Sequence, residues 1–183
     1  MTHPWHDLPN DPAKAHICFQ AVIEIPKGSK IKYELDKPSG LMRVDRVLYS
    51  SVMYPANYGF IPRTYCDDDD PLDVLVLGNE SVVPGCILEA RAIGVMHMLD
   101  EGKHDDKIIA VHVSDPGFTD YTDISQIPRH VLREMKRFFE DYKMLENKKV
   151  QVDDFQGPEK AMEVLQAAFD LYRSSESKLR GWA

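Results

Sequence analysis

The spacing of short apolar segments constrains the fold of this chain more than any other feature of its sequence. The first two thirds of the chain contain short apolar runs that often alternate with polar residues, at 19–25, 30–35, 41–47, 73–77, 86–98 and 107–113. A period of two is typical of β-strands. Gly and Pro separate the runs and predict turns between them, as at Pro84 and Gly85.

Helical periodicity replaces this alternation in the last third of the chain. Pro128 is suited to the first turn of a helix, and a second helix is predicted to start at Pro158. The apolar residues that recur on one face of each predicted helix are Val131, Leu132, Met135, Phe138, Phe139 and Tyr142, and then Met162, Leu165, Phe169 and Tyr172. Many strands followed by two helices predict a mainly β chain, a curled sheet or small barrel with helices packed on it.

Length and charge limit the domain count and the partners. At 183 residues without an evident linker, the chain is expected to form a single domain over residues 1–183. A formal net charge of −8 disfavours binding to nucleic acid, because the molecule as a whole repels polyanions.

Cysteine use and the N-terminal segment indicate a cellular compartment. Cys18, Cys66 and Cys86 are odd in number and form no CxxC spacing, so neither a disulfide framework nor a zinc finger is supported. The N-terminal residues lack the features of a signal or transit peptide, and no apolar run approaches the roughly 18 residues of a membrane span. A cytoplasmic protein without membrane contact is expected.

The stretch "YCDDDDPLDVLVL" at 65–77 crowds carboxylates against an apolar strand. Two carboxylates about 4 Å apart repel by roughly 4 kcal/mol at an effective dielectric near 20, so they either point apart into water or share a positive partner. Asp67–Asp70 alone would suit a solvated turn. Asp73, at the start of the apolar run, favours a cluster of Asp68, Asp70 and Asp73 drawn together by a turn at Pro71, which would suit a hard divalent cation.

Two common ion and phosphate motifs do not account for this stretch. An EF-hand loop starting at Asp68 would have Asp73 where Gly is required and Asn79 where Glu is required. The P-loop pattern GxxxxGK[ST] is absent. A second acidic group, "DEGKHDDK" at 100–107, by itself predicts a solvated hairpin loop. It would have a functional role only if it lies beside the first cluster.

Basic and tyrosine side chains complete a set suited to phosphate chemistry. Lys32 and Glu34 would share one face of a strand, and Arg46 lies among apolar neighbours. Tyr54 and Tyr58 by themselves are more often packing residues. If these side chains converge with the carboxylates, bound cations and basic groups could neutralise phosphate oxygens while a metal-bound water acts as nucleophile.

Together these residues resemble the soluble inorganic pyrophosphatases of the family I type, over a core of about residues 17–173. "DDDPLDV" at 68–74 is similar to the Asp-x-Asp-Pro-x-Asp motif of that family, and Asp100, Asp105 and Lys107 match its second acidic element. "VIEIPKGSKIKYELDK", "VDR", "YPANYGFIP" and "FFEDYK" also match. The resemblance implies a five-stranded, OB-like closed barrel with two flanking C-terminal helices, α+β in content.

The resemblance also implies roles for individual residues. Asp70 would orient and deprotonate the attacking water. The implied metal ligands are Asp68, Asp73 and Asp105, with Asp100 for a further ion and Glu34 acting through water. The implied substrate-binding residues are Lys32, Arg46, Tyr58, Lys107, Tyr142 and Lys143. Glu24 and Tyr54 would support them, and Asp106, adjacent to Asp105, is the alternative at that position.

The activity implied by the resemblance is hydrolysis of pyrophosphate to two orthophosphates by a Mg-activated water or hydroxide held between metal ions. Several Mg²⁺ ions per site are expected, with Mn²⁺ or Zn²⁺ as substitutes, and removal of pyrophosphate would pull biosynthetic reactions forward. A homo-oligomer is implied, with a hexamer favoured over a dimer. The alternatives are an OB-type module that binds single-stranded nucleic acid, which the acidic charge disfavours, and a calcium-binding structural domain.

Overall fold

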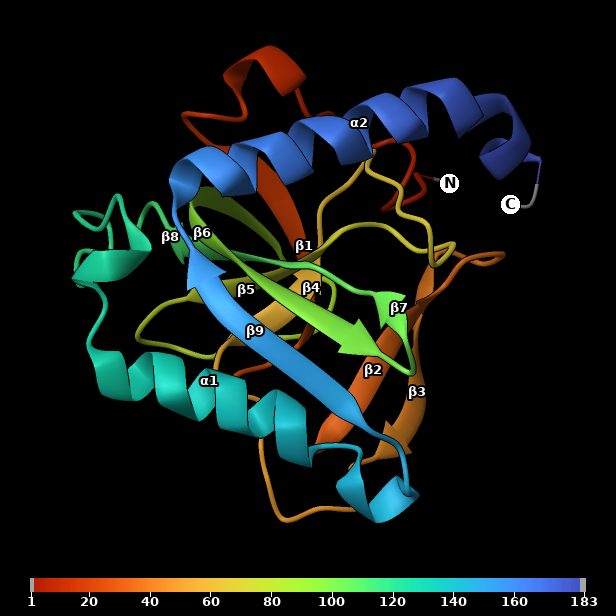
Figure 1. Cartoon of the computed structure of the whole chain (residues 1–183). Coiled ribbons are helices and arrows are strands. Elements are labelled where there is room, and N and C mark those ends of the chain that lie inside the picture. The colour runs from red at the N-terminus through yellow and green to blue at the C-terminus, as the bar shows by residue number, and fades with distance from the viewer. Residues whose placement is uncertain (1, 182–183) are drawn as a thin grey trace.

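A computed structural model describes residues 2–181 and shows a mainly β chain with two helices in its C-terminal third (Figure 1). The strands are β1 (Phe19–Ile25), β2 (Ile31–Asp36), β3 (Leu41–Val47), β4 (Asn57–Phe60), β5 (Asp73–Leu77), β6 (Ile87–Asp100), β7 (Lys103–His104), β8 (Lys107–His112) and β9 (Val150–Gln156). The helices are α1 (Arg129–Asp141) and α2 (Pro158–Arg180), with short 3₁₀ turns η1 (Pro12–Lys14), η2 (Ile124–Gln126) and η3 (Met144–Glu146). The predicted fold class is therefore confirmed at the level of a mainly β chain with two C-terminal helices.

Hydrogen-bonded strands close into a ring in the order β1, β4, β5, β8 and β6, because β6 also pairs with β1. All neighbours in the ring are antiparallel except β5 and β8, which are parallel. β9 adds to β6, and β2 with β3 forms a separate hairpin beside the ring. In Figure 1 the hairpin stands at one side of the ring, between the two helices.

The apolar runs predicted as strands are strands, with ends shifted by at most two residues. β4, β7 and β9 had no separate strand prediction. β4 lies inside "YPANYGFIP", where prolines interrupt any alternation, and β9 is largely exposed and polar in sequence. Alternation is weak in such segments, so pairing with a neighbouring strand decides their conformation.

β5 is buried on both faces, which explains its unbroken apolar sequence. Val74 and Val76 pack in the cluster that contains Leu165 and Phe169 of α2. Leu75 and Leu77 pack in the cluster that contains Phe138 and Phe139 of α1. The two helices thus cover opposite sides of this strand, and the predicted apolar faces of both helices are the faces that pack.

The chain before β1 folds back onto α2. Trp5 and His6 are 1% and 2% exposed; Trp5 packs in a cluster with Tyr172 and Leu179 of the helix, and His6 Nδ1 lies 2.9 Å from the Tyr172 hydroxyl oxygen. Arg180 donates to the Asp7 carboxylate and to the His6 carbonyl oxygen. α2 therefore continues well past Tyr172, beyond the core of about residues 17–173 predicted from the sequence. Neither this helix nor any other within residues 2–181 has the length and apolar character required to span a bilayer.

Candidate active site

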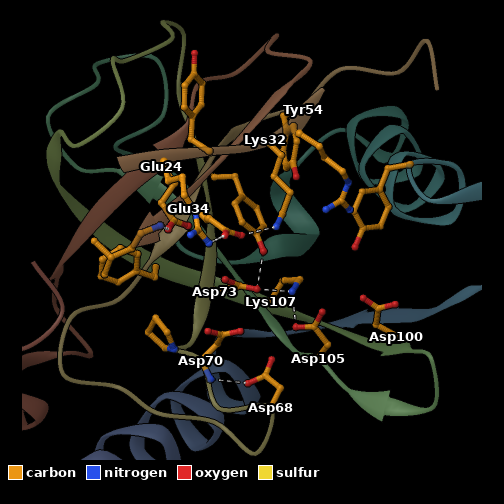
Figure 2. Close-up of a pocket in the computed structure, with 18 of the residues that line it drawn as sticks. Glu24, Lys32, Glu34, Tyr54, Asp68, Asp70, Asp73, Asp100, Asp105 and Lys107 are labelled. Atoms are coloured by element: carbon orange, nitrogen blue, oxygen red, sulfur yellow. Dashed lines mark hydrogen bonds and ion pairs between the residues drawn. The ribbon is translucent and has the colours of Figure 1, made fainter. Parts of the chain in front are cut away.

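A cavity of about 650 Å³ opens between the ring and the β2–β3 hairpin (Figure 2). Every residue that the sequence predicts for the site lines it: Glu24, Lys32, Glu34, Arg46, Tyr54, Tyr58, Asp68, Asp70, Asp73, Asp100, Asp105, Lys107, Tyr142 and Lys143. The structure thus brings together side chains that are far apart in sequence. Their individual roles remain predictions.

Strand periodicity explains why three of these side chains enter the same cavity. Asp73 begins β5 and shares a face with Leu75 and Leu77, because side chains alternate along a strand. Lys107 begins the parallel strand β8 directly opposite Asp73 in register. Tyr58 of β4 pairs with Leu75 and points to the same side. The polar ends of these strands therefore extend one continuous inner face.

The second acidic group reaches the cavity through a tight hairpin. Asp100 ends β6 and pairs with Lys103 of β7 across Glu101 and Gly102, which both have positive φ. The amide of Asp105 then donates to the Met98 carbonyl oxygen over 3.0 Å and returns the chain to the inner face. Residues 100–105 do form a hairpin loop, as their sequence alone suggests, and this loop holds two of the cavity's carboxylates.

Asp105, rather than Asp106, faces the cavity. Asp106 points the other way and lies 2.8 Å from Nδ1 of His97. The distinction follows from strand periodicity, since Asp105 lies two residues before Lys107 and shares its side.

Asp68 and Asp70 are held by a compact turn. The amide of Asp70 donates to the Asp68 carboxylate over 3.2 Å, and the Cys66 amide donates to the Asp70 carbonyl oxygen over 2.9 Å. Asp69, between them, has φ +69°, a left-handed conformation that Asp tolerates better than most residues. The turn orients Asp68 and Asp70 toward the cavity in Figure 2.

Lys107 is the cation at the centre of the cavity. It is 2% exposed, and its ammonium donates to both Asp73 and Asp105. Tyr58 Oη donates to the same Asp73 carboxylate over 2.5 Å. Burial acts to lower the pKa of Lys107, but these two carboxylates outweigh it and raise the pKa well above its usual value. Lys107 is therefore charged at neutral pH.

The carboxylates that Lys107 does not fully neutralise show perturbed ionisation. Burial, together with the charges of Asp73, Asp70 and Asp105, raises the pKa of Asp68 to about 6. Burial also raises the pKa of Asp105, which Lys107 opposes. Burial and neighbouring carboxylates both disfavour the ionised form, and a cation bound beside these groups would favour it.

Asp100 has one hydrogen-bond acceptor that no described residue satisfies. One of its carboxylate oxygens pairs with the Lys143 ammonium, whereas the buried Oδ1 has no hydrogen-bond partner within residues 2–181. A buried carboxylate oxygen normally has a partner. Carboxylate oxygens of this kind are donors that Mg²⁺ prefers.

These donors are not arranged as a finished metal cage. Within the described part of the chain, no group of three or more acidic, His or Cys side chains is placed to hold a metal ion. Lys107 lies between Asp73 and Asp105, and the other carboxylates are spread around the cavity (Figure 2). The carboxylate oxygens fit divalent cations, and the shell would require additional oxygens from water or a phosphate ligand.

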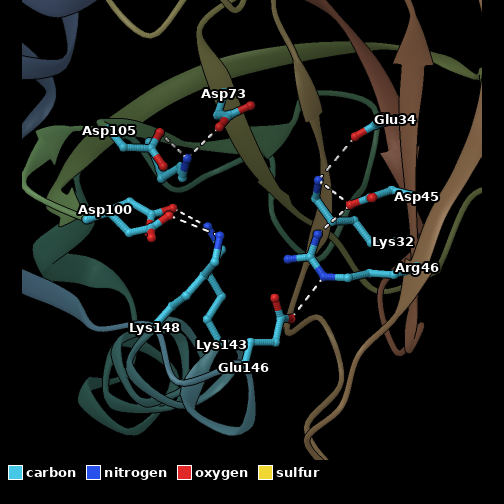
Figure 3. Close-up of polar contacts among 12 residues, drawn as sticks. Lys32, Glu34, Asp45, Arg46, Asp73, Asp100, Asp105, Lys143, Glu146 and Lys148 are labelled. Atoms are coloured by element: carbon cyan, nitrogen blue, oxygen red, sulfur yellow. Dashed lines mark hydrogen bonds and ion pairs between the residues drawn. The ribbon is translucent and has the colours of Figure 1, made fainter.

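The hairpin supplies the opposite wall of the cavity with basic side chains (Figure 3). Lys32 pairs with Asp45 over 2.9 Å and with Glu34 over 3.4 Å. Arg46 donates to Asp45 over 2.5 Å and to Glu146 over 2.9 Å. All these basic groups are already paired with carboxylates, so an anionic ligand has to exchange places with those carboxylates.

Sequence reasoning missed Arg43, Lys37 and Glu146. Arg43 lines the cavity and donates to Glu34 over 2.8 Å. Arg43 and Arg46, three residues apart, face the same side because an irregularity in strand pairing inserts Asp45 between them. Only the register of the hairpin reveals this. Lys37 pairs with the Asp70 carboxylate, and no periodic signal identifies it because it lies in the hairpin turn.

Three of the predicted residues, Glu24, Tyr54 and Tyr142, are buried. The Glu24 carboxylate accepts from the Leu35 amide over 2.7 Å and so ties β1 to β2. Burial, and next the charge of Asp73, raises the pKa of Glu24 to about 8, which keeps most of it protonated at neutral pH. Burial also raises the pKa values of the Tyr54 and Tyr142 hydroxyls, so both tyrosines are neutral.

The sequence of this chain is similar to those of inorganic pyrophosphatases. A family model described as inorganic pyrophosphatase matches residues 21–173. Soluble inorganic pyrophosphatase PPA1 of Solanum tuberosum is 62% identical over 170 residues, which cover 93% of this chain and 80% of that protein. Soluble inorganic pyrophosphatase 1 of Arabidopsis thaliana is 61% identical over the same shares of 93% and 80%.

Solved structures agree in fold over nearly the whole chain. The inorganic pyrophosphatase of Thermus thermophilus superposes with a TM-score of 0.89 at 38% identity, covering 94% of this chain and 99% of that one. The inorganic pyrophosphatase of Helicobacter pylori superposes with a TM-score of 0.85 at 44% identity, covering 91% of this chain and 98% of that one. This chain belongs to the inorganic pyrophosphatase family.

Proposed function

We propose that this chain hydrolyses inorganic pyrophosphate to two orthophosphates with the help of Mg²⁺. The observation that carries the proposal is the meeting of two sets of side chains in one cavity: carboxylates from the ring and basic groups from the hairpin and the region after α1. Pyrophosphate is a small, highly charged anion, and a chain of net charge −8 has to concentrate cations locally to bind it. Family membership supports the same activity.

The carboxylates would hold the cations. Asp68, Asp73 and Asp105 are proposed as the main ligands, with Asp100 for a further ion and Glu34 acting through water. When bound, divalent cations would neutralise phosphate oxygens and lower the pKa of a coordinated water. The unpartnered Asp100 oxygen and the raised pKa of Asp68, which comes first from burial, support this assignment, because a bound cation would give the first a partner and favour the ionised form of the second. Mn²⁺ or Zn²⁺ could take the same oxygen ligands.

Asp70 is proposed to accept the proton of the attacking water. Its carboxylate is 56% exposed on the turn at the cavity edge, so water can reach it. The Asp70 carboxylate also pairs with the Lys37 ammonium at the cavity edge. A positioned general base of this kind contributes about 10²- to 10⁴-fold to a rate.

The basic side chains would bind the two phosphoryl groups. Lys32, Arg46 and Lys143 line the cavity, and each is paired with a carboxylate of the chain. Cations that bind those carboxylates would release the ammonium and guanidinium groups to the phosphates. Tyr58, Tyr142 and Lys107 would add donors from the inner face. Substrate and cations are therefore expected to bind with mutual dependence.

Several wider features are part of the same proposal. The ring of strands is proposed to be the five-stranded, OB-like barrel of the family, and residues 1–183 to form one domain. We propose a homo-oligomer, a hexamer in preference to a dimer, that acts in the cytoplasm without nucleic-acid or membrane partners. Removal of pyrophosphate would pull the biosynthetic reactions that release it forward.

A colorimetric assay of orthophosphate released from pyrophosphate, with and without Mg²⁺, tests the proposal. Asp70→Asn should lose about 100-fold or more in turnover while keeping its unfolding midpoint, because an amide cannot accept the proton. Asp120→Asn, on an exposed loop outside the cavity, is the matched control and should keep full activity. Near-normal release by Asp70→Asn would refute the role of Asp70. No release of orthophosphate by the unmodified chain with Mg²⁺ would refute the function. In that case, a gel shift with single-stranded nucleic acid would support a nucleic-acid-binding module. Stabilisation by Ca²⁺ without turnover would support a calcium-binding structural domain.

A further inference from the structure

The segment before β1 contacts the active-site wall at two places. Nε2 of His3 lies 2.7 Å from the carbonyl oxygen of Lys37, in the turn of the β2–β3 hairpin. A Cβ atom built on Gly40, in the same turn, would lie 3.2 Å from Pro4 Cδ. The segment therefore packs tightly against the hairpin that carries the basic residues.

Trp5 is the anchor of this segment. Its indole Nε1 donates to the Thr64 carbonyl oxygen over 2.8 Å, and its own carbonyl oxygen accepts from the Arg63 amide over 2.9 Å. Thr64 in turn accepts from the Leu72 amide through its hydroxyl over 2.9 Å. Trp5 is thus bonded to the beginning of the loop that leads from β4 through the Asp68–Asp70 turn to β5.

The indole ring also supports two side chains that hold this turn. Lys37 Nζ lies 5.7 Å from the centre of the Trp5 ring, donates to the Asp69 carbonyl oxygen over 2.8 Å and pairs with the Asp70 carboxylate. Tyr65, whose ring centre lies 6.2 Å from that of Trp5, donates its hydroxyl to the Asp69 carboxylate. Lys37 and Tyr65, the two side chains that bond to the turn, therefore both lie beside the same buried aromatic ring.

We propose that Trp5 and Lys37 are positioning residues of the active site: Trp5 supports Lys37 and Tyr65, and these fix the turn that carries Asp68 and Asp70. This inference rests on the proposed function and extends it to a segment outside the family match, which begins at residue 21. The turn needs such support because Asp69 has a left-handed backbone and the neighbouring carboxylates repel one another. Lys37 supplies both a hydrogen bond to the backbone and a positive charge.

Amide hydrogen exchange tests the positioning role without metal or substrate. Lys37→Met and Trp5→Leu should speed exchange in peptides covering residues 66–72, where the Cys66, Asp69 and Asp70 amides are hydrogen-bonded within the turn. Peptides from β6 and β8 should exchange as in the unmodified chain. The controls are Lys160→Met, which removes an exposed lysine of α2, and Leu179→Ala, which removes a buried side chain of the Trp5 cluster away from the turn.

Kinetics of the same variants with pyrophosphate and Mg²⁺ provide a second readout. Lys37→Met should lower kcat on the order of tenfold to a hundredfold, the effect of losing a charge-assisted hydrogen bond, with KM changed less than about threefold. Lys37→Arg should recover part of kcat, since the guanidinium keeps the charge and donors. Trp5→Phe should recover more than Trp5→Leu, because it keeps an aromatic ring under Lys37.

The positioning role of Trp5 and Lys37 and the proposed function can be refuted independently of each other. Unchanged exchange at residues 66–72 and unchanged kcat in Lys37→Met would overturn the positioning role, even if the unmodified chain hydrolyses pyrophosphate. Faster exchange throughout the chain in Trp5→Leu, with normal kcat in Lys37→Met, would also overturn it, because Trp5 would then act only on overall stability. Absence of orthophosphate release by the unmodified chain would refute the proposed function, whereas the exchange experiment would still decide whether Trp5 and Lys37 hold the turn.

Discussion

Replacement of Lys107 by Met is the most informative perturbation of the cavity. Lys107 is 2% exposed and donates to both Asp73 and Asp105, whose side chains are 22% and 17% exposed. Methionine preserves most of the packing volume but leaves the two carboxylates facing each other without a cation. We therefore expect a large loss of stability in the absence of metal.

The size of this loss follows from the burial of the three groups. Removing one partner of a buried ion pair costs about 3–5 kcal/mol, because an uncompensated charge remains in a poorly solvated place. Both carboxylates keep some contact with solvent, so the lower end, about 3 kcal/mol, is expected. With a urea m-value of about 2 kcal/mol/M, the unfolding midpoint should fall by roughly 1.5 M. Lys160→Met, which removes an exposed lysine paired with Glu163, should shift the midpoint by less than about 0.3 M.

Divalent cations should rescue this variant selectively. If Asp73 and Asp105 are metal ligands, Mg²⁺ replaces the missing ammonium and raises the midpoint of Lys107→Met more than that of the unmodified chain, at fixed protein concentration. Urea unfolding followed by circular dichroism, at several Mg²⁺ concentrations, measures both effects. A midpoint that is unchanged by the substitution, or a variant no more sensitive to Mg²⁺ than the unmodified chain, would refute this reasoning.

Three further predictions concern the scaffold. Gly59→Ala should prevent soluble expression, because the new Cβ would lie 1.9 Å from the Val22 carbonyl oxygen; recovery of a folded variant would contradict the packing of β1 on β4. Burial, followed by nearby positive charges, lowers the pKa of His6 from 6.5 to about 4, so the contribution of His6 to stability should be largest above pH 6.5, fall by up to about 3 kcal/mol toward pH 4 and then level off. Urea midpoints of a His6→Asn variant should lack this acid-dependent loss, and an equal loss would show that His6 is not its source. A double-mutant cycle of Arg46→Met and Glu146→Gln should give a coupling of about 1 kcal/mol, since the pair is only partly exposed, whereas additive effects would mean that it does not join the hairpin to η3.

The sequence was sufficient to predict many, but not all, of the side chains that line the cavity. Asp73 and Lys107 each begin a strand, so alternation alone places them on the same face as their apolar neighbours Leu75 and Ile109. Asp105 could be separated from Asp106 for the same reason. The acidic motifs and the strand pattern are therefore enough to predict this part of the site.

The remaining parts of the site depend on contacts that periodicity does not encode. Arg43 reaches the cavity only because the hairpin register contains an irregularity at Asp45. Lys37 lies in a turn, and its ammonium lies 5.7 Å from the ring centre of Trp5, a residue far in sequence from both acidic motifs. β9 has a polar outer surface and becomes a strand by pairing with β6. Such features result from tertiary pairing, which a local pattern cannot specify.

The adjacent residues Asp105 and Asp106 provide the most direct test of the central claim, that carboxylates gathered on the inner face form a metal-dependent site for pyrophosphate. Asp105 lines the cavity, whereas Asp106 pairs with His97 outside it. Orthophosphate release from pyrophosphate should be measured across a Mg²⁺ titration for Asp105→Asn and Asp106→Asn. The account predicts that Asp105→Asn loses most turnover or needs far more Mg²⁺, while Asp106→Asn behaves as the unmodified chain. Equal behaviour of the two variants would contradict it.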